Sequence, residues 1–415
     1  MDKNKIINLG CRLNIYEGEI IKNHLLKEKL HNITVINSCA VTEEAEKKVA
    51  YEIRKAKKIN PSNKIVVTGC AAQIDPDKYN NISEVDRVVG NTEKLKLQTW
   101  KNLNLVNRVE VGNILEESTT VPSSIEKFEG KSRAYIEIQQ GCDHRCTFCI
   151  IPFGRGNNRS VPAGEIVSKI KKMVKSGYNE VVLTGVDITD YGKDLPGKPT
   201  FTNLIKRILK LVPELKRLRL SSIDCAEIDD EFWDILENKR LMPHFHISLQ
   251  AGNNMILKRM KRRHQREHAI DFCSKLKSIR PEVIFGADLI AGFPTETEEM
   301  FHNTLKIIDE CDLTLLHIFP FSPMQKTPAS KMPQVPRNII KERAKILREK
   351  GQLKIKNKFK DTIGQKLNVL TEKDSFGYSE NYLKVKITGN QKVDEGQIIP
   401  VYITGFSPSY LKAEI

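Results

Sequence analysis

Short apolar runs that alternate with longer amphipathic stretches occupy most of this chain, and this alternation constrains its fold more than any other feature. Alternating strand and helix signals are typical of parallel sheets built from βαβ units. The first hundred residues contain four such runs, KIINLG, ITVINS, KIVVTG and DRVVG. They predict an α/β domain with a parallel sheet.

A second series of six apolar runs follows a polar break. The runs are RAYIEIQQG, EVVLTGVD, RLRLSSID, HFHISLQAG, VIFGADLIAGFP and LTLLHIFPFSP. A closed (β/α)8 barrel needs two more strands. We therefore expect a central open (β/α)6 partial TIM barrel, whose working face is the carboxyl end of its strands.

The remaining segments suggest where the domains end. Residues 112–132 are polar, contain Pro and Ser, and indicate a linker. A basic helix is expected over 337–360, and from 361 short runs separated by turns predict a small antiparallel β-barrel. The expected domains are 1–115, 128–358 and 359–415.

The net charge of +15 is concentrated in two places. Residues 257–268 contain six Lys or Arg against one Glu, and residues 337–360 contain ten against two. One such run is explained by a solvated helix face, but two separated runs favour a polyanionic partner. No window approaches the ~20 apolar residues of a membrane span, and MDKNKIINLGC lacks the regions of a secretory signal. We expect a cytoplasmic protein that binds no membrane.

The first three apolar runs each end in a cysteine, at Cys11, Cys39 and Cys70. The carboxyl ends of strands in an open parallel sheet share one edge, so three thiolates can converge there. A buried core cysteine is the alternative for any one of them, but three strands that end alike favour a shared role. In a cytoplasmic chain, regularly spaced cysteines indicate metal ligation or redox chemistry rather than disulfides.

The segment GCDHRCTFCIIPFGRG ends the first barrel strand and places Cys142, Cys146 and Cys149 in C-x3-C-x2-C spacing. A zinc site or a saturated four-iron cluster needs four ligands. His144 is the nearest alternative fourth ligand, but folding it back within so short a loop introduces strain. Three thiolates leave one iron of a [4Fe-4S] cluster open, and an open iron can chelate S-adenosylmethionine for radical chemistry.

The cysteine spacing, its place at a strand end and the barrel that follows resemble the radical S-adenosylmethionine superfamily. The three upstream cysteines and the small terminal β-barrel narrow the resemblance to methylthiotransferases, over essentially the whole chain. The segments NLGCRLN, INSCAVTEEAEKK, VVTGCAAQ, GCDHRCTFCIIPFGRG and GYSENYLKVKI are most similar to the MtaB-type branch. That branch modifies N6-threonylcarbamoyladenosine at position 37 of tRNA.

The resemblance implies an enzyme with two [4Fe-4S] clusters, each held by three cysteines. Cys142, Cys146 and Cys149 would hold the radical-generating cluster, and the upstream triad would hold a second cluster that supplies sulfur. Two S-adenosylmethionine molecules would then be consumed in placing a methylthio group on carbon 2 of the adenine. A protein such as a flavodoxin or a ferredoxin would supply electrons, and no catalytic residue beyond the cluster ligands is identified.

Polar residues at other barrel-strand ends are candidates for binding the cofactor, although a helix cap explains each of them about equally well. They are Thr184, Gly185, Asp187, Ser221, Ser222, Gln250 and Asp288. The turn Gly292, Phe293 and Pro294 resembles the family's glycine-bearing turn near the adenine, and a plain turn explains it almost as well. Cys225, Cys273 and Cys311 fall outside both patterns and are expected to be packed thiols.

The terminal barrel resembles the TRAM module, a small RNA-binding fold. Its charges nearly cancel, so phosphate contacts are expected mainly from the first basic segment, through Lys258, Arg259, Lys261, Arg262 and Arg263. Tyr378, with Phe376 and Tyr382, could stack on bases, although barrel-core positions are an equal alternative. Gln325 and Lys326 depart from the family's usual arginine and glycine before Thr-Pro-Ala.

Two other interpretations remain. A sister methylthiotransferase would act on N6-isopentenyladenosine in tRNA or on an aspartate of a ribosomal protein, although PFGRG and NLGCRLN favour the threonylcarbamoyl branch. A protein of another class would bind RNA without catalysis and use its cysteines only for structural metal. That protein would have saturated four-ligand sites and would not cleave S-adenosylmethionine.

Overall fold

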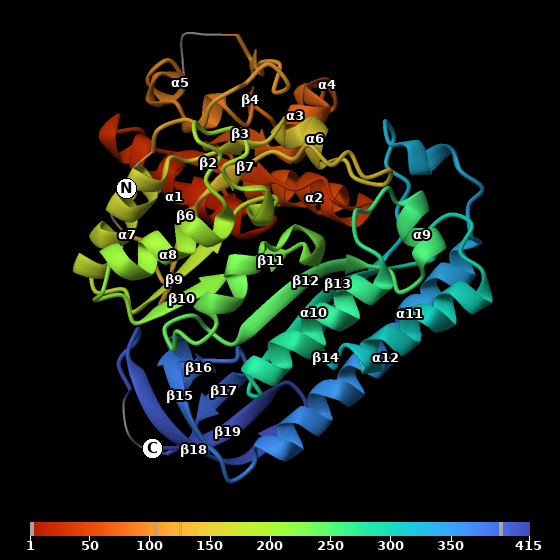
Figure 1. Ribbon diagram of the computed structural model, residues 1–415. Helices are drawn as coiled ribbons and strands as arrows, with labels where there is room; N and C mark the ends of the chain where they lie inside the picture. Colours follow the sequence, from red (N-terminus) through yellow and green to blue (C-terminus); the bar gives the residue numbers. More distant parts are fainter. Residues whose placement is uncertain (1–3, 104–106, 124, 126, 390–392) are drawn as a thin grey trace.

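The computed structural model describes residues 4–103, 107–123, 125, 127–389 and 393–415, so the first three residues of the expected amino-terminal domain lie outside it. Figure 1 shows an amino-terminal sheet above a central half-open barrel, with a small β-barrel below. The α/β class with a carboxyl-terminal antiparallel barrel is as the sequence predicts. Within the described residues, no helix is long and apolar enough to cross a membrane.

The amino-terminal sheet consists of five parallel strands in sequence order. They are β1 (Lys5–Asn8), β2 (Ile33–Ser38), β3 (Lys64–Gly69), β4 (Arg87–Val89) and β5 (Val109–Glu110). Helices α1 (Arg12–Lys27) and α2 (Glu43–Ile59) connect the first three strands. All six residues of β2 are buried, which explains its continuous apolar pattern. Four strands were predicted, and the two-residue β5 is too short to produce a recognisable run.

The central domain contains all six predicted strand regions. They are β6 (Ala134–Glu137), β9 (Glu180–Thr184), β10 with β11 (Arg217–Leu220 and Ser222–Ile223), β12 (His244–Gln250), β13 (Ile284–Ala291) and β14 (Leu313–Pro320). The third region is interrupted at Ser221, since β10 pairs with β9 whereas β11 pairs with β12. The strands thus follow one another around the barrel as two sheets, β6-β9-β10 and β11-β12-β13-β14. In the described part of the chain, β14 does not pair with β6, so the barrel stays open.

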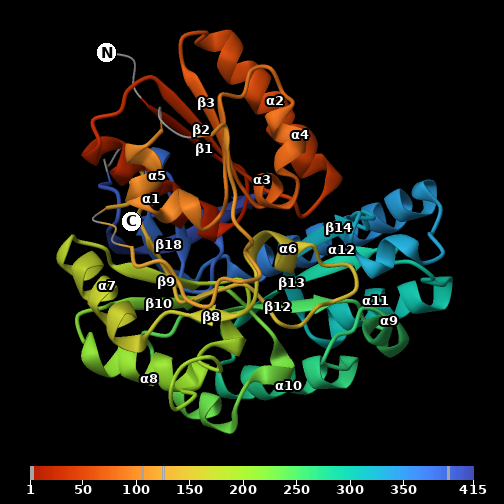
Figure 2. The ribbon, with the colours of Figure 1, turned by 90° about the horizontal axis from the view of Figure 1, so that it is seen from above.

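Helices cover the outer face of this half-barrel, as Figure 2 shows from above. They include α7 (Ala163–Lys175), α8 (Phe201–Leu211), α10 (Arg266–Ile279) and α11 (Glu298–Glu310). Their apolar residues, such as Ile170, Leu204 and Phe272, join the strands in one large buried cluster. The barrel wall is therefore rigid, and the inner face remains available for polar residues.

The expected linker, residues 112–132, contains no helix or strand in its described part, but it packs against both neighbouring domains. Phe128 is completely buried and lies 5.9 Å from Tyr135 and 6.2 Å from Tyr178, ring centre to ring centre. It also contacts Tyr16 of α1, with ring centres 6.5 Å apart. The segment therefore fastens the amino-terminal domain to the central one.

The predicted basic helix is α12 (Arg337–Thr362), which lies along β14. The chain then forms a closed barrel of β15 (Lys366–Thr371), β16 (Phe376–Ser379), β17 (Lys384–Ile387), β18 (Ile398–Ser407) and β19 (Tyr410–Glu414). Phe359 of α12 and Ile284 of β13 belong to the core of this barrel. The small barrel is thus attached directly to the amino-terminal ends of the central strands.

Candidate active site

The first cysteine triad lies on the loop between β7 (Gln139–Gln140) and α6 (Ile151–Arg155), at the carboxyl end of β6. The backbone N–H of Cys149 donates to the carbonyl of Cys146 at 3.0 Å. Burial and the neighbouring Cys146 raise the pKa of Cys149 to about 12, and burial with Asp187 raises that of Cys142. Such thiols ionise only when a cationic group binds them, as an iron–sulfur cluster does.

His144, inside the same loop, lies against two carboxylates. Its Nε2 lies 2.9 Å from Asp187 Oδ2 and 3.3 Å from Glu227 Oε1. Burial alone lowers the pKa of His144, but these two partners outweigh it and raise the value to about 10. His144 therefore fastens the cysteine loop to the loops after β9 and β11, which does not favour its use as a fourth metal ligand.

Arg262, expected to contact RNA phosphate, instead has partners inside this site. Its side chain is only 8 % exposed and donates from Nη1 to Cys146 Sγ at 3.5 Å. Its Nη2 donates to Asp224 Oδ2 at 2.6 Å. A guanidinium beside a thiolate stabilises the negative charge of a cysteine-ligated cluster. The basic run concealed this role, because charge alone does not show which side chain turns inward.

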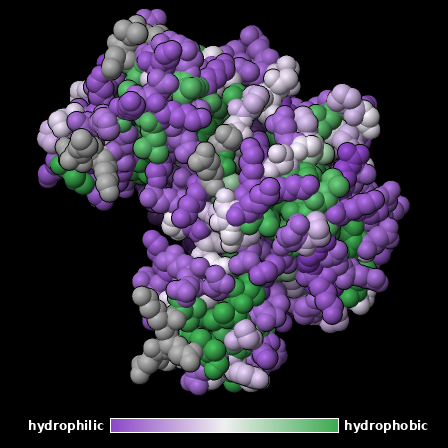
Figure 3. Space-filling view, turned by 90° about the vertical axis from the view of Figure 1, so that its left-hand side faces the viewer, coloured by the Kyte–Doolittle hydropathy of each residue, from purple (hydrophilic) through white to green (hydrophobic). Residues whose placement is uncertain are grey.

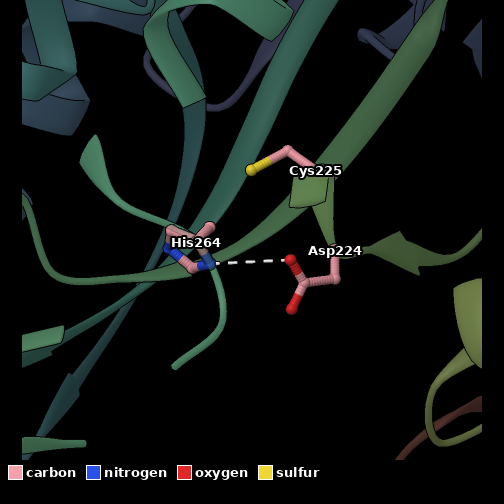
Figure 4. A group of neighbouring side chains, drawn as sticks. All are labelled: Asp224, Cys225 and His264. Atoms are coloured by element: carbon pink, nitrogen blue, oxygen red, sulfur yellow. Dashed lines mark ion pairs between the residues drawn. The ribbon is translucent and has the colours of Figure 1, made fainter. Parts of the chain in front are cut away.

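Asp224 also has a histidine neighbour. His264 Nδ1 lies 3.5 Å from Asp224 Oδ1, the pair drawn as a dashed line in Figure 4. Burial favours the neutral acid, but His264 and Arg262 outweigh it and lower the pKa of Asp224. The neighbouring Cys225 is buried, as are Cys273 and Cys311, so the expectation of packed thiols is confirmed for all three.

The second cysteine triad lies at the carboxyl edge of the amino-terminal sheet. Cys11 precedes α1, Cys39 follows β2, and Cys70 begins the short helix α3 (Cys70–Ile74) after β3. Burial raises the pKa of Cys39 to about 11, with further contributions from Cys70 and Cys11, so the three sulfurs act on one another. Asn91 Nδ2 lies 3.8 Å from Cys70 Sγ. The structure thus brings together three cysteines that are far apart in sequence.

Both triads are too widely spaced for a single ion. Three groups of His, Cys, Asp or Glu in the described residues have ligand atoms that all lie within 4.8 Å of one another, and none of these groups includes a triad cysteine. A tetrahedral zinc ion needs its ligands closer than this. A larger group with three thiolate ligands, such as a four-iron cluster, fits the donor chemistry of both triads.

Helix α6 joins the two triads. A Cβ atom added at Gly154 would lie 3.1 Å from Cys70 Cβ, so this glycine permits α6 to pack directly on α3. Ile150, the residue after Cys149, is buried in the apolar core of the amino-terminal domain. The segment that follows the first triad therefore forms a wall of the second.

A buried ionic network anchors α6. Arg155 Nη1 lies 2.8 Å from Glu17 Oε1, and Lys94 Nζ lies 2.7 Å from Glu17 Oε2, with all three side chains at most 2 % exposed. Burial lowers the pKa of Lys94, but its three N–H donors all have acceptors, on Glu17, Asn37 and Asn91, and we assign it the charged form. The two cations thus share the carboxylate of Glu17 as their buried counter-charge.

The candidate cofactor residues occupy several environments. Asp187 lies 3.7 Å from Cys142 Sγ, and Ser221 Oγ is buried without a hydrogen-bond partner among the described residues, which suits a polar ligand. Thr184 is buried, whereas Gly185, Ser222 and Gln250 are partly exposed. Phe293 of the Gly292–Pro294 turn is fully buried against Phe148 and Phe321.

Asp288, a candidate cofactor residue, does not lie at the end of its strand as expected. Strand β13 continues for three residues beyond it, so Asp288 lies within the barrel rather than at the strand end. Its Oδ1 lies 3.0 Å from His246 Nε2 and 3.2 Å from His317 Nδ1. A single continuous apolar run gave no sign of where the strand stopped.

Gln139 is a site residue that the sequence analysis missed. Its side-chain carbonyl accepts the backbone N–H groups of Val186 and Asp187 at 2.9 and 2.8 Å. Its amide donates to the carbonyl of Gly141 at 2.6 Å and to Asn158 Oδ1. It therefore links the base of the cysteine loop to the loop after β9. A glutamine at a strand end carries no distinctive sequence signal.

The expected RNA contacts differ in their exposure and in their partners. Lys258, Lys261 and Arg263 are exposed, although Arg263 also pairs with Glu227. Arg259 is partly buried and donates to Thr295. Tyr378 stacks on Tyr382 with ring centres 4.8 Å apart and lies 4.9 Å from the Arg133 guanidinium. The partly buried ring thus has contacts within the protein, and its stacking on a base stays a prediction.

The other aromatic and basic residues near these contacts face different surroundings. Phe376 packs edge to face with Tyr410, with ring centres 5.4 Å apart, and lies beneath Lys384. Lys326, in the segment that departs from the family pattern, donates to the carbonyl of Ile74 in α3 at 2.9 Å. This departure therefore adds a contact between the central and amino-terminal domains.

Comparison with known proteins agrees with this geometry. Residues 136–308 match the Radical SAM superfamily, and residues 3–90 match the Uncharacterized protein family UPF0004. The chain is 54 % identical to the threonylcarbamoyladenosine tRNA methylthiotransferase MtaB of Rickettsia prowazekii, over 99 % of this chain and 97 % of the relative. It is 32 % identical to the tRNA-2-methylthio-N(6)-dimethylallyladenosine synthase of Aliarcobacter butzleri, over the full length of both.

A solved structure shares the fold. The radical S-adenosylmethionine methyltransferase TsrM of Kitasatospora setae, which has cobalamin and a [4Fe-4S] cluster bound, superimposes with a TM-score of 0.55 at 14 % identity, over 78 % of this chain and 77 % of that one. Full-length relatives and the two family matches lead to one assignment. The chain belongs to the methylthiotransferase family of radical S-adenosylmethionine proteins.

Proposed function

We propose that this protein transfers a methylthio group to carbon 2 of N6-threonylcarbamoyladenosine at position 37 of tRNA. The observation that carries the proposal is the joining of two cysteine triads through α6, with Gly154 packed on Cys70. A methylthiotransferase needs a radical source and a sulfur source near one substrate atom, and two adjacent triads can hold both. The name of the 54 %-identical relative supports the choice of nucleoside.

Cys142, Cys146 and Cys149 would hold a radical-generating [4Fe-4S] cluster, and Cys11, Cys39 and Cys70 would hold a second one. When bound, the first cluster with S-adenosylmethionine supplies a carbon-centred radical, and the second supplies sulfur. Arg262 stabilises the thiolate of Cys146, while His144 and Glu227 hold the loop in position. The proposed contacts to S-adenosylmethionine remain Thr184, Gly185, Asp187, Ser221, Ser222, Gln250 and Asp288.

The chain's surface supports tRNA as the partner. Lys258 and Lys261 are exposed near the site and are proposed to contact phosphate. The TRAM-like barrel, proposed as domain 359–415 beside domains 1–115 and 128–358, would extend the contact to RNA. A flavodoxin or ferredoxin is the proposed electron donor, and the proposed location is the cytoplasm.

Mass spectrometry of tRNA nucleosides tests the proposal. The gene is expressed in cells that lack their own methylthiotransferases, and 2-methylthio-N6-threonylcarbamoyladenosine is expected only when it is present. Appearance of the methylthio group on N6-isopentenyladenosine or on a ribosomal-protein aspartate instead would replace the substrate. A protein with saturated metal sites that leaves S-adenosylmethionine intact would overturn the enzymatic assignment altogether.

A further inference from the structure

The inner face of the half-barrel contains polar residues that the proposed chemistry does not use. Along β12, Phe245 and Ile247 belong to the outer apolar core, so His244 and His246, on the alternate positions, face the lumen. Gly286 of β13 makes room for one of them, because an added Cβ there would lie 2.5 Å from His246 Nδ1. The lumen is therefore shaped around imidazole groups.

One carboxylate joins two of these groups on neighbouring strands. Asp288 accepts from both His246 and His317, whose ring centres are 4.7 Å apart. The side chain of His317 is 63 % exposed, and its Nδ1 contacts Asp288. The Nε2 atom of this ring therefore points away from the carboxylate, and it has no partner among the described residues.

A residue of the small barrel closes the lower end of the lumen. The ring of Tyr382 stacks on His244 with centres 4.7 Å apart, and the Arg219 guanidinium lies 4.8 Å from it. The hydroxyl of Tyr382 accepts from Arg12 Nη2 at 3.3 Å. Arg12 is the residue after Cys11, so the amino-terminal triad and the lumen meet at this point.

Arg12 differs from the other arginines here because it has no carboxylate partner. Arg133 and Arg219 both pair with the buried Glu180, and Arg133 also pairs with Glu372. Among the described residues, Arg12 forms no ion pair, and its only side-chain hydrogen bond is to Tyr382. Burial, Arg219, His246, Arg12 and His317 together lower the pKa of His244 well below its usual range, which indicates a positive potential.

The lumen is accessible from one side. The barrel has no strand pairing between β14 and β6. The space-filling view in Figure 3 shows the surface hollowed between the upper, amino-terminal part and the lower, small barrel, with mainly hydrophilic side chains around the hollow.

We propose that Arg12 and His317 bind the carboxylate of the N6 substituent, so that the lumen selects adenosines with an anionic N6 group over those with a neutral one. This inference rests on the proposed function and explains its substrate choice. In adenine, N1 is bonded to C2 and to C6, which carries N6, so C2 and the substituent share one edge of the ring. A substituent bound by Arg12, the residue after Cys11, would keep this edge on the side of the amino-terminal triad.

Synthetic anticodon stem-loops test the inference. Three RNAs share one sequence and carry N6-threonylcarbamoyladenosine, its analogue with the carboxylate converted to a carboxamide, or N6-isopentenyladenosine. Binding is measured by fluorescence anisotropy with the cluster-loaded protein, and thiolation is measured as KM and kcat. For the wild type, we expect the carboxylate RNA to bind about tenfold or more tightly than its carboxamide, the range of one charge-assisted hydrogen bond.

The variants are Arg12→Gln and His317→Asn, and the control is Arg54→Gln, which removes one charge from an exposed arginine on α2. Arg12→Gln should raise KM for the carboxylate RNA about tenfold and leave the carboxamide RNA unaffected, whereas Arg12→Lys should recover part of the loss. His317→Asn, remote from the cysteines, provides a second test if Arg12→Gln retains less iron. Arg54→Gln should behave like the wild type.

The outcomes separate the two proposals. The carboxylate contact would be overturned if Arg12→Gln and His317→Asn weakened the binding of the carboxylate and carboxamide RNAs equally, or left the binding of both unchanged. Either result would leave the proposed function intact. Thiolation by the wild type of the isopentenyl RNA alone would instead overturn the proposed function. Selective loss of preference for the carboxylate RNA would support both.

Discussion

Glu17 is expected to control how firmly the amino-terminal domain is held to the central one. The Arg155 and Lys94 charges overcome burial and lower the pKa of Glu17 from 4.5 to about 2. At about 1.4 kcal/mol per pKa unit, this favours the carboxylate by about 3 kcal/mol. Glu17→Gln leaves two buried cations without a counter-charge, for which losses of about 3–5 kcal/mol are typical. We therefore expect the variant to lose about 3 kcal/mol of local stability.

Hydrogen exchange followed by mass spectrometry measures this loss. A loss of about 3 kcal/mol accelerates exchange about a hundredfold where opening is reversible. The affected peptides should cover α1 and α6, including the Gly156 N–H that donates to the Pro152 carbonyl at 2.8 Å. Glu43→Gln is the control, because the ion pair of Glu43 with Lys47 is exposed. Unchanged exchange in α6 of Glu17→Gln would refute the reasoning.

The ion pairs of Glu17 make the stability of the protein depend on pH in a definite direction. Since the pKa of Glu17 is lower in the folded protein, its stabilisation is complete above pH 4.5 and disappears as the pH falls through about 2. The difference between the wild type and Glu17→Gln should therefore narrow below pH 4.5. Urea unfolding of iron-free protein measures it, because the clusters themselves are lost in acid.

Three further comparisons of variants test the site. Arg262→Gln should reduce iron retention and S-adenosylmethionine cleavage but leave tRNA affinity intact. The double variant Lys258→Ala with Lys261→Ala should instead lower the salt slope of tRNA binding by about two and leave the iron content unchanged. Equal effects of the two variants on tRNA binding would contradict the inward role of Arg262. Gly154→Val should lower iron content by about half through contact with Cys70, while Gly164→Val, with open space around it, should lose none. Replacing Cys142, Cys146 and Cys149 by Ala should preserve circular dichroism and tRNA binding but abolish turnover, and an unfolded product would favour a structural metal site.

The architecture was predictable because it depends on hydrophobic periodicity. The six strand regions of the half-barrel and helix α12 all follow from runs that repeat at the spacing of strands or helices. The convergence of Cys11, Cys39 and Cys70 was also predictable, since it follows from the geometry of a parallel sheet. The two-residue β5 was missed because so short a segment has no period.

The individual side chains were less predictable, because their roles depend on partners far away in sequence. In the sequence, Arg262 is one of the six basic residues of the 257–268 segment. Its inward orientation depends on Asp224, which lies 38 positions earlier in the chain. Glu17, Lys94 and Arg155 come from three separate segments and form one network. Tyr378 follows the alternation of a barrel strand, and that alternation does not reveal that another domain covers the ring.

Ile150 has a consequence for the order in which the chain acquires its shape during synthesis. It follows Cys149 directly, yet it is buried in the core of the amino-terminal domain, which leaves the ribosome first. We expect the loop with the three thiols to dock on the amino-terminal domain through this side chain as soon as it emerges. Early docking would limit the exposure of these thiols to oxidation or to a wrong metal.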